Sequence, residues 1–173
     1  QMVTEILETA RLKSEYGHLN LKETDLVKLI RDICITFEGQ NPGIRFENTP
    51  EKCQIFADAE QIETVLKNLL ANALKYSTVG NAPVEICLKK SDAGTFIEIQ
   101  DHGPGIQDEE LGFIFEPFYR IDKSRNKTTG GYGLGLSLCK NIIEAHGGKI
   151  TVLSKLGEGT IFKFNIPNYP KTN

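Results

Sequence analysis

Hydrophobic side chains recur every three to four residues in several stretches of the chain, the spacing of helices that bury one face. This pattern predicts helices over residues 2–16, 25–37, 58–75 and 134–146, and a shorter one over 108–115. The apolar faces of the three long helices after residue 24 hold Leu26, Leu29, Ile30, Ile33, Cys34 and Phe37; Ile62, Val65, Leu66, Leu69, Leu70 and Ala73; and Leu136, Cys139, Ile142 and Ile143. The polar residues 17–24 are interpreted as a connection.

Alternating apolar and polar positions predict strands in the remaining stretches. The first two are short, at residues 44–47 and 53–57. Two hairpins follow, one from 83–90 and 95–101 and one from 149–154 and 159–166, each with a glycine-containing turn between its strands.

Composition places these elements in one globular domain. The chain has 173 residues, 39% hydrophobic and 25% charged, which suffices for a sizeable core. Its net charge of −3 argues against a nucleic-acid surface, and no apolar run reaches membrane-spanning length. Four scattered cysteines, each in an apolar run, predict buried reduced thiols rather than a zinc site or disulfides. Since the chain begins at Gln1, we expect it to be a piece of a longer protein.

The stretch from Gly130 to Leu138 has four glycines in its first six residues and continues directly into a helix. Converging backbone N–H groups and a helix N-terminus together can hold phosphate. The run lacks the Gly-Lys-Ser/Thr ending of a P-loop and the third glycine of a dinucleotide-binding turn. Taken alone, it is equally consistent with a flexible surface loop.

Asn68, Asn72 and Lys75 fall on one polar stripe beside the apolar face of their predicted helix. Amide oxygens are neutral, hard ligands that suit a Mg²⁺ ion already carrying phosphates and water. The stripe therefore suggests a polyphosphate site. A solvated helix face with two incidental amides is the alternative.

Asp101 follows Ile97 and Ile99 in the same strand register, so it should point inward at the end of a buried strand face. A carboxylate in an apolar pocket needs a partner, and the exocyclic amine of a purine would provide one. The alternative is an aspartate that caps the turn after its own strand.

Two further features border the glycine-rich stretch. Phe113, Phe115, Phe118 and Tyr119 precede Arg120, and we expect most of these aromatic rings in the core. Residues 121–129 are polar and carry Lys123, Arg125 and Lys127, which is typical of a mobile lid over bound phosphate.

Four segments, taken in order, resemble the sequence boxes of one family. Residues 68–77 are similar to its N box, 101–106 to its G1 box, 113–120 to its F box and 131–136 to its G2 box. The chain, over about residues 24–167, thus resembles the catalytic ATP-binding domain of two-component sensor histidine kinases. That domain has the Bergerat ATPase fold shared with gyrase, HSP90 and MutL (the GHKL superfamily). The resemblance implies an α+β fold, a two-layer α/β sandwich whose mixed sheet carries helices on one face.

The resemblance also assigns roles to residues. Asp101 would accept the adenine amino group with Thr160 nearby, Asn72 would hold Mg²⁺, and Tyr76 would face the ribose. Asn68, Lys75 and Arg120 would be the catalytic side chains, the last two through the phosphates. The whole ATP-binding set implied is Asn68, Asn72, Lys75, Tyr76, Asp101, Gly103, Gly105, Ile106, Arg120, Lys123, Gly131, Tyr132, Gly133, Leu134, Gly135, Leu136 and Thr160.

The activity implied is transfer of the γ-phosphoryl group of Mg·ATP to a histidine for relay to a response-regulator receiver domain. Residues 1–23 would end an upstream dimerisation and phosphoacceptor hairpin, and 24–173 would form the ATP-binding domain. None of His18, His102 and His146 has the family's phosphoacceptor context, so the substrate histidine would lie upstream. We expect this piece to be mainly monomeric and cytoplasmic and its parent to be a homodimer, with membrane anchoring of the parent left open.

Asn68 stands where hydrolysing members of the superfamily carry a water-activating glutamate, and an amide is no base at neutral pH. The amide disfavours water as the phosphoryl acceptor and favours a kinase. A conformational ATPase of the gyrase, HSP90 or MutL type is the second hypothesis. A non-catalytic interaction module is the third. Tyr132 departs from the small hydroxyl residue that is frequent at its place in the family.

Overall fold

The computed structural model describes residues 19–47, 50–77, 82–121 and 132–168. The predicted helix over residues 2–16 and most of the predicted lid lie outside this part of the chain. The elements are β1 (Lys22–Asp25), α2 (Leu26–Ile35), β2 (Ile44–Arg45), β3 (Gln54–Ala57), α3 (Ala59–Tyr76), β4 (Val84–Ser91), β5 (Gly94–Asp101), α4 (Asp108–Leu111), α5 (Gly135–Ala145), β6 (Ile150–Lys155) and β7 (Gly159–Ile166).

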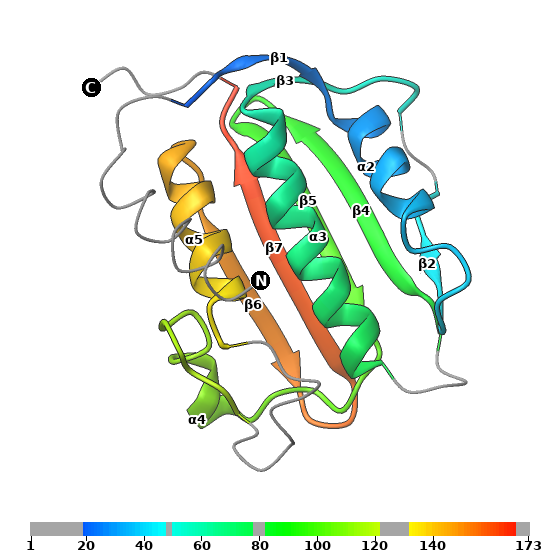
Figure 1. Cartoon of the computed structure of the whole chain (residues 1–173), viewed down its shortest axis with the longest axis vertical. Coiled ribbons are helices and arrows are strands. Elements are labelled where there is room, and N and C mark those ends of the chain that lie inside the picture. The colour runs from blue at the N-terminus through cyan, green and yellow to red at the C-terminus, as the bar shows by residue number, and fades with distance from the viewer. Residues whose placement is uncertain (1–18, 48–49, 78–81, 122–131, 169–173) are drawn as a thin grey trace.

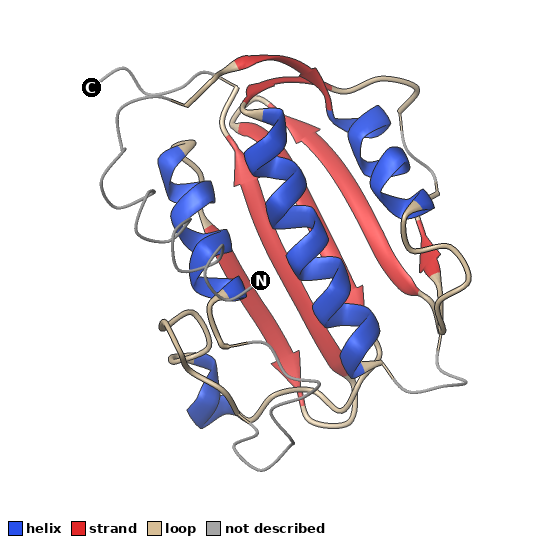
Figure 2. Cartoon of the chain, viewed as in Figure 1, coloured by secondary structure: helices blue, strands red, loops and turns tan. Residues whose placement is uncertain are grey.

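Five strands form a mixed sheet in the order β2-β4-β5-β7-β6. β2 runs parallel to β4, and every other neighbouring pair in this sheet is antiparallel. The helices α2, α3 and α5 lie together on one face of the sheet, with α3 in the middle (Figures 1 and 2). This arrangement confirms the expected α+β fold with helices packed on one face.

The core lies between the helices and the inward side chains of β4, β5 and β7. The central helix α3 contributes five fully buried residues, Ile62, Val65, Leu66, Leu69 and Leu70. The strands contribute Val84, Ile97, Ile99, Phe162, Phe164 and Ile166, at the alternating positions that the sequence predicts. Removal of this apolar surface from water is the main force that holds the two layers together.

Aspartates cap the first two helices, which is why both begin where the sequence predicts. The carboxylate of Asp25 accepts hydrogen bonds from the backbone N–H groups of Val27 and Lys28. The carboxylate of Asp58 accepts one from the backbone N–H of Gln61, 3.2 Å away. Each satisfies donors that the first helical turn leaves unpaired.

Two boundary predictions were wrong. The predicted polar connection over residues 17–24 includes all but the last residue of β1, which pairs antiparallel with β3 to form a two-stranded sheet. Its first two residues are exposed and the others half-buried, so it lacks the apolar alternation that marks a strand. The short helix predicted over 108–115 ends at Leu111, because Gly112 follows and glycine disfavours helix continuation.

Two burial predictions also need correction. Phe115 and Tyr119 are half-buried, but Phe113 is 54% exposed and Phe118 is 66% exposed, so the aromatic cluster is not mainly core. Phe118 has a positive φ of 65°, and its ring points outward after Pro117. All four cysteines are free thiols, but only Cys53 and Cys139 are buried. Cys87 is exposed because it sits between the inward-facing Ile86 and Leu88 of β4, on the open face of the sheet.

Within the described residues, none of the helices combines the length and the apolar character needed to cross a bilayer.

Candidate functional site

The predicted site residues gather at one end of the sandwich. The C-terminal half of α3, the end of β5, the β6–β7 turn and the start of α5 meet there, next to α4 (Figure 1). Lys123 and Gly131 lie outside the described residues. The other predicted residues come from segments far apart in the sequence, which the fold brings to one edge.

Asp101 is the buried carboxylate of this site, and only 5% of its surface is exposed. It ends β5 and stands directly opposite Thr160 of β7 in the strand register. The backbone N–H of Gly103 donates to its Oδ1 at 2.9 Å, and a hydrogen bond from the backbone of Thr160 also supports it. Burial raises the pKa of Asp101 above its ordinary value, while these two donors and His102 oppose the rise. The carboxylate is thus held in position and can still accept a further hydrogen bond from a ligand.

Ser154 is a residue of this pocket that the sequence reasoning missed. Its hydroxyl lies 2.9 Å from the Oγ1 of Thr160, donates to the carbonyl oxygen of Gly159 at 2.8 Å, and accepts the N–H of Ile106 at 2.8 Å. It therefore joins the turn after β5 to the start of β7. The available signal was a serine at an inward position near the end of a strand, the same signal that singled out Asp101.

The glycines of the turn after β5 allow two close approaches of backbone. A Cβ on Gly103 would lie 2.6 Å from the carbonyl oxygen of Tyr76, at the end of α3. A Cβ on Gly105 would overlap the carbonyl oxygen of Lys155, at the end of β6. The predicted G1 turn thus packs directly against the end of the predicted N-box helix.

Asn68, Asn72, Lys75 and Tyr76 follow one another along the site end of α3. Asn68 and Asn72 are half-buried, whereas Lys75 and Tyr76 are exposed, and the Lys75 ammonium lies 5.2 Å from the Tyr76 ring centre. The amide nitrogen of Asn68 donates to the carbonyl oxygen of Thr64 at 2.9 Å, so its oxygen faces the other way. The row presents neutral oxygens followed by one positive charge.

These donors fit a magnesium ion that is held mainly by phosphate. Within the described residues, no group of three or more His, Cys, Asp or Glu side chains could bind a metal by itself. Amide oxygens such as that of Asn72 can add one hard ligand to a hydrated Mg²⁺ that is already bound to a nucleotide. A metal site of this kind depends on the nucleotide.

The start of α5 meets α3 at Asn68. A Cβ on Gly135, the first residue of α5, would lie 2.8 Å from the Asn68 amide oxygen. The first turn of the helix carries backbone N–H groups without partners inside the helix, and its dipole favours a nearby anion. Leu134 is buried and Leu136 half-buried, so their side chains pack into the core and only their backbone can serve a ligand.

The glycine-rich loop is held against the predicted F box. The N–H of Phe118 donates to the carbonyl oxygen of Gly133 at 2.9 Å. Tyr119, whose hydroxyl donates to the carboxylate of Glu110, anchors this turn to α4. Arg120 follows directly and is half-buried, and Tyr132 is half exposed.

We expect Gly133→Ala to weaken both the fold and nucleotide binding. Gly133 has a φ of 77°, and a Cβ there would lie 2.7 Å from the Tyr119 carbonyl oxygen and 2.8 Å from the Phe118 carbonyl carbon. The left-handed backbone alone costs a residue with a side chain about 1–2 kcal/mol, and the clash with backbone adds to this. Gly157→Ala is the matched control, since Gly157 has a φ of 80° and no atom within 4 Å of the added Cβ. Urea unfolding and ATP titration of both variants measure the difference. Equal losses in the two would show that the loop contact contributes nothing.

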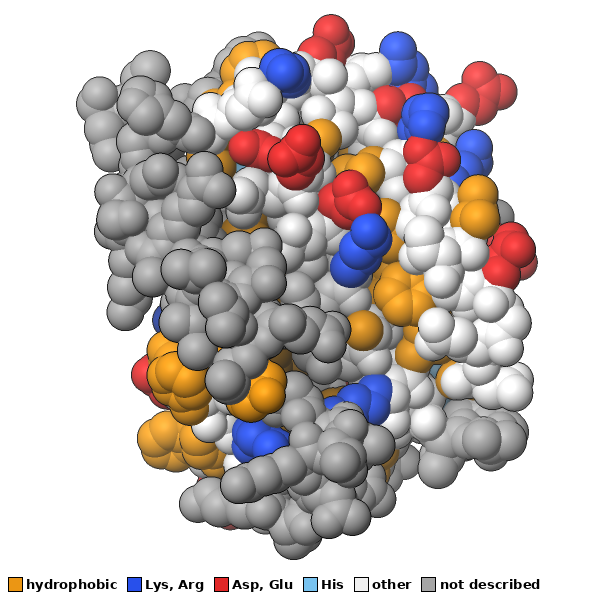
Figure 3. Space-filling model, in the orientation of Figure 1, with side chains coloured by type: hydrophobic (Ala, Val, Ile, Leu, Met, Phe, Trp, Pro, Cys, Tyr) orange, Lys and Arg blue, Asp and Glu red, His pale blue; other side chains and the backbone are white. Residues whose placement is uncertain are grey.

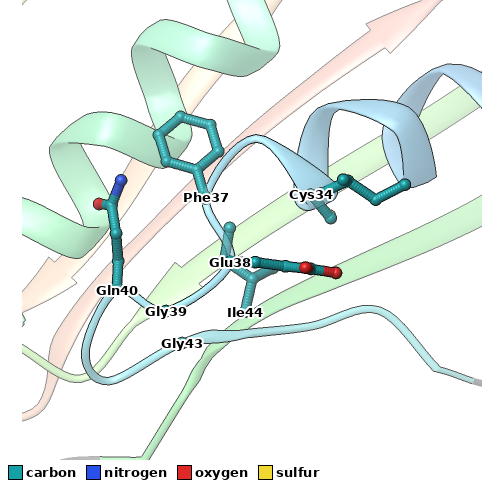
Figure 4. A pocket seen from close by; sticks show the side chains of 8 residues that line it. Cys34, Phe37, Glu38, Gly39, Gln40, Gly43 and Ile44 are labelled. Carbon is teal, nitrogen blue, oxygen red and sulfur yellow. The ribbon is translucent and has the colours of Figure 1, made fainter.

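The surface has two other features: a cavity away from the predicted site residues and a hydrophobic patch next to them. A cavity of about 320 Å³ at the end of α2 is lined by Cys34, Ile35, Phe37, Glu38, Gly39, Gln40, Gly43 and Ile44 (Figure 4). It shares no residue with the predicted site and lacks converging phosphate donors. Hydrophobic side chains also gather on the surface over α4 and the start of α5 (Figure 3), where Phe113, Phe118, Ile121 and Tyr132 are all at least half exposed.

Comparisons with known proteins identify the family of the chain. Residues 57–170 match the family model described as "Histidine kinase-, DNA gyrase B-, and HSP90-like ATPase". The chain is 39% identical to the sensor histidine kinase YkoH of Bacillus subtilis, over 87% of the chain and 33% of that protein. It is 35% identical to the adaptive-response sensory kinase SasA of Prochlorococcus marinus, over 89% of the chain and 41% of that protein.

Solved structures show the same fold. The catalytic domain of histidine kinase ThkA superposes with a TM-score of 0.75 and 31% identity, covering 88% of this chain and 98% of that one. Full-length ShkA in complex with AMPPNP superposes with a TM-score of 0.80 and 26% identity, covering 99% of this chain and 36% of ShkA.

The fold therefore defines an ATPase-type domain, an α/β sandwich with the predicted site residues gathered at one end. The chain belongs to the histidine kinase-, DNA gyrase B- and HSP90-like ATPase family, and its fold is that of a histidine kinase catalytic domain. This confirms the resemblance inferred from the four boxes. The chain spans between 33% and 41% of the length of the two relatives named above.

Proposed function

We propose that this chain is the catalytic ATP-binding domain of a sensor histidine kinase, and that it transfers the γ-phosphoryl group of Mg·ATP to a histidine on an upstream domain. From there the phosphoryl group would pass to an aspartate of a response-regulator receiver domain. The family, the kinase relatives and the constellation of residues at one end of the sandwich support this proposal.

Each part of the site has a role in this proposal. Asp101 and Thr160 bind the adenine, Tyr76 lies beside the ribose, and the N–H groups at the start of α5 meet the phosphates. Asn68 and Asn72 supply amide oxygens, Asn72 as the Mg²⁺ ligand. The cations Lys75 and Arg120 meet the phosphates, and Lys123, which lies outside the described residues, is assigned to the phosphates from the sequence alone. When bound, Mg²⁺ would neutralise part of the charge on the phosphates.

The observation that carries the choice of a kinase is Asn68. Its amide oxygen faces Gly135 at the start of α5, where a carboxylate would be placed to activate water in a hydrolase. An amide cannot accept the proton of an attacking water at neutral pH. No acidic residue occurs from Asn68 to Tyr76. The site is therefore suited to position ATP for a nucleophile supplied from outside.

The transfer itself requires little covalent chemistry from this domain. A histidine nitrogen attacks the γ-phosphorus, a P–N bond forms, and the bond to the β–γ bridging oxygen breaks to release ADP. Positioning and charge neutralisation supply the catalysis, as is general for phosphoryl transfer. Lys75 and Arg120 provide the charges of this chain that stabilise the departing diphosphate.

The exposed hydrophobic surface of Phe113, Phe118, Ile121 and Tyr132 supports access by a second domain. Phe118 of this surface is hydrogen-bonded to Gly133 of the glycine-rich loop, so the surface borders the proposed site, where the phosphoacceptor domain would approach the γ-phosphate. We expect dimerisation to reside in the parent protein, with this domain alone mainly monomeric. Sedimentation of the chain tests that expectation.

Incubation of the parent protein with γ-labelled Mg·ATP tests the proposed function. We expect an acid-labile, alkali-stable phosphoprotein that passes its label to a receiver domain, while this chain alone releases little phosphate. Steady phosphate release by this chain, abolished by Asn72→Ala and without labelled protein in the parent, would instead establish a conformational ATPase. No measurable Mg·ATP binding would leave only an interaction module.

A further inference from the structure

The far end of the helical layer, away from the site, holds a polar link between α3 and α5. His146, at the end of α5, is only 5% exposed, and its Nε2 accepts the backbone N–H of Asp58 at 3.1 Å. Asp58 is the residue that caps α3. The two helices lie side by side on the sheet (Figure 1), so this bond ties the start of one to the end of the other.

The bond requires one particular state of the imidazole ring. Nδ1 lies 2.8 Å from the carbonyl oxygen of Ile142, which can only accept, so Nδ1 carries the proton and Nε2 is free to accept from Asp58. Burial lowers the pKa of His146 below its ordinary value, which favours the neutral ring, although the hydrogen bond to Ile142 and the nearby Asp58 carboxylate oppose the shift.

Asp58 is itself held by several bonds. One carboxylate oxygen accepts the N–H of Gln61, and the other accepts the N–H of Asn20 at 3.0 Å. Its carbonyl oxygen accepts the N–H of Ile62, the first bond of the helix. Asp58, the partner of His146, thus joins the start of α3 to the segment just before β1.

Besides apolar packing, the described residues of the α3–α5 pair make polar or close contacts at both ends and in the middle. His146 meets Asp58 at one end, the thiol of Cys139 lies 3.8 Å from the carbonyl oxygen of Val65 in the middle, and Gly135 abuts Asn68 at the site. The helices run antiparallel, so a bond at the far end restricts how α5 can slide along α3. A shift of α5 along α3 would change the distance between Gly135 and Asn68, and the bond at the far end opposes such a shift.

We propose that His146 is a positioning residue for the nucleotide site. By holding α5 in register with α3, it keeps the N–H groups at the start of α5 at the correct distance from Asn68 and Asn72. The proposal rests on the proposed function, because those groups are assigned to the phosphates. The adenine pocket of Asp101 and Thr160 belongs to β5 and β7 and does not depend on this link. Loss of the link should therefore affect a triphosphate more than a diphosphate.

Calorimetric titration of this chain with Mg·ATP and Mg·ADP tests the proposal in His146→Phe and His146→Gln. Phenylalanine fills a similar volume without an acceptor, whereas the glutamine amide oxygen can take the place of Nε2. We expect His146→Phe to weaken Mg·ATP binding about tenfold, the size of effect that follows when a hydrogen bond to a charged phosphate oxygen is lost. Mg·ADP binding should change less than about twofold, and His146→Gln should recover most of the loss.

Ile30→Val is the matched control for general destabilisation. Ile30 is fully buried on α2 and belongs to neither the link nor the site. Three results would show that His146 serves stability alone. His146→Phe could weaken the binding of Mg·ATP and Mg·ADP equally, or Ile30→Val could change the ratio of the two affinities as much as His146→Phe does. The third result is that His146→Gln binds Mg·ATP no better than His146→Phe.

The tautomer of His146 gives a second measurement that needs no variant. Nitrogen NMR of the wild-type chain should show a protonated Nδ1 and an unprotonated Nε2 for this ring, and the reverse tautomer would overturn the proposal. A wild type that binds neither nucleotide would contradict the proposed function, and this inference with it. Binding of both with an unchanged ATP-to-ADP ratio in His146→Phe would contradict this inference alone.

Discussion

Asp101→Asn is expected to weaken Mg·ATP binding about ten- to a hundredfold, since a hydrogen bond to an ionised group contributes about 1.5–3 kcal/mol. The buried carboxylate is an acceptor only, and the exocyclic amine of adenine is a donor. An asparagine amide can still accept the N–H of Gly103, so the turn after β5 should keep its shape. If the asparagine oxygen keeps the bond from Gly103, its NH₂ group faces the adenine amine, and two donors meet. If the amide turns over, it loses the bond from Gly103 and offers the adenine only a neutral, weaker acceptor.

The same substitution should leave the fold intact or stabilise it slightly. Burial raises the pKa of Asp101, which means that the folded protein bears a desolvation cost for this charge. Removing the charge removes that cost. Reduced affinity together with an unchanged or higher melting temperature would identify a carboxylate that is kept for binding rather than for stability.

Glu98→Gln provides the control for Asp101→Asn. Glu98 lies on the same strand but faces the open side of the sheet, where it pairs with Lys163 at 2.6 Å. We expect this variant to bind Mg·ATP as the wild type does. Calorimetric titration of the three proteins decides the matter. Wild-type affinity in Asp101→Asn would remove the adenine pocket from this end of the sandwich.

The sequence predicts correctly those elements in which the spacing of apolar residues matches the buried face of a helix or strand. In α3, a capping aspartate, seven buried apolar residues and a separate polar stripe all define the same helix. In β5, strict alternation predicts that Asp101 points inward, and its burial confirms this. Such elements are determined by local rules that a single segment obeys by itself.

The parts that the sequence did not predict depend on partners elsewhere in the chain. β1 is a strand because β3 lies beside it, and its own four residues are too polar to show a strand pattern. Ser154 acquires its place in the site from Thr160 and Ile106, on two other segments. Phe118 is exposed because its backbone turns at positive φ to meet Gly133, and no hydropathy pattern records such a turn.

The glycines show how the four boxes become one site. Gly103 brings the turn after β5 against the end of α3, Gly133 brings the glycine loop against the F-box turn, and Gly135 brings α5 against Asn68. Each contact joins two boxes that are separated in the sequence. An added Cβ would collide with backbone at Gly103 and Gly133 and would press on the Asn68 side chain at Gly135. The boxes, to which the proposal assigns the ligand groups, therefore also supply the packing surfaces that bring these residues together.

Asn72→Ala is expected to have the largest effect on the reaction itself. Loss of one preorganised group that stabilises charge in the transition state typically reduces the rate about a hundred- to a thousandfold. In the parent protein, histidine phosphorylation should fall by this order, because the phosphates would keep the metal without its ligand from α3. In this chain alone, removal of Mg²⁺ with EDTA should weaken ATP binding in the wild type and change it much less in Asn72→Ala.

Combining Asn72→Ala with EDTA treatment distinguishes an amide that binds the metal from one that binds the nucleotide directly. If Asn72 acts through the metal, the two losses do not add, since each removes the same interaction. Asn141→Ala is the control, because Asn141 is a half-buried amide on α5 with no assigned role. It should keep the full response to EDTA. Losses that add in Asn72→Ala would show that this amide contacts the nucleotide directly rather than through the metal.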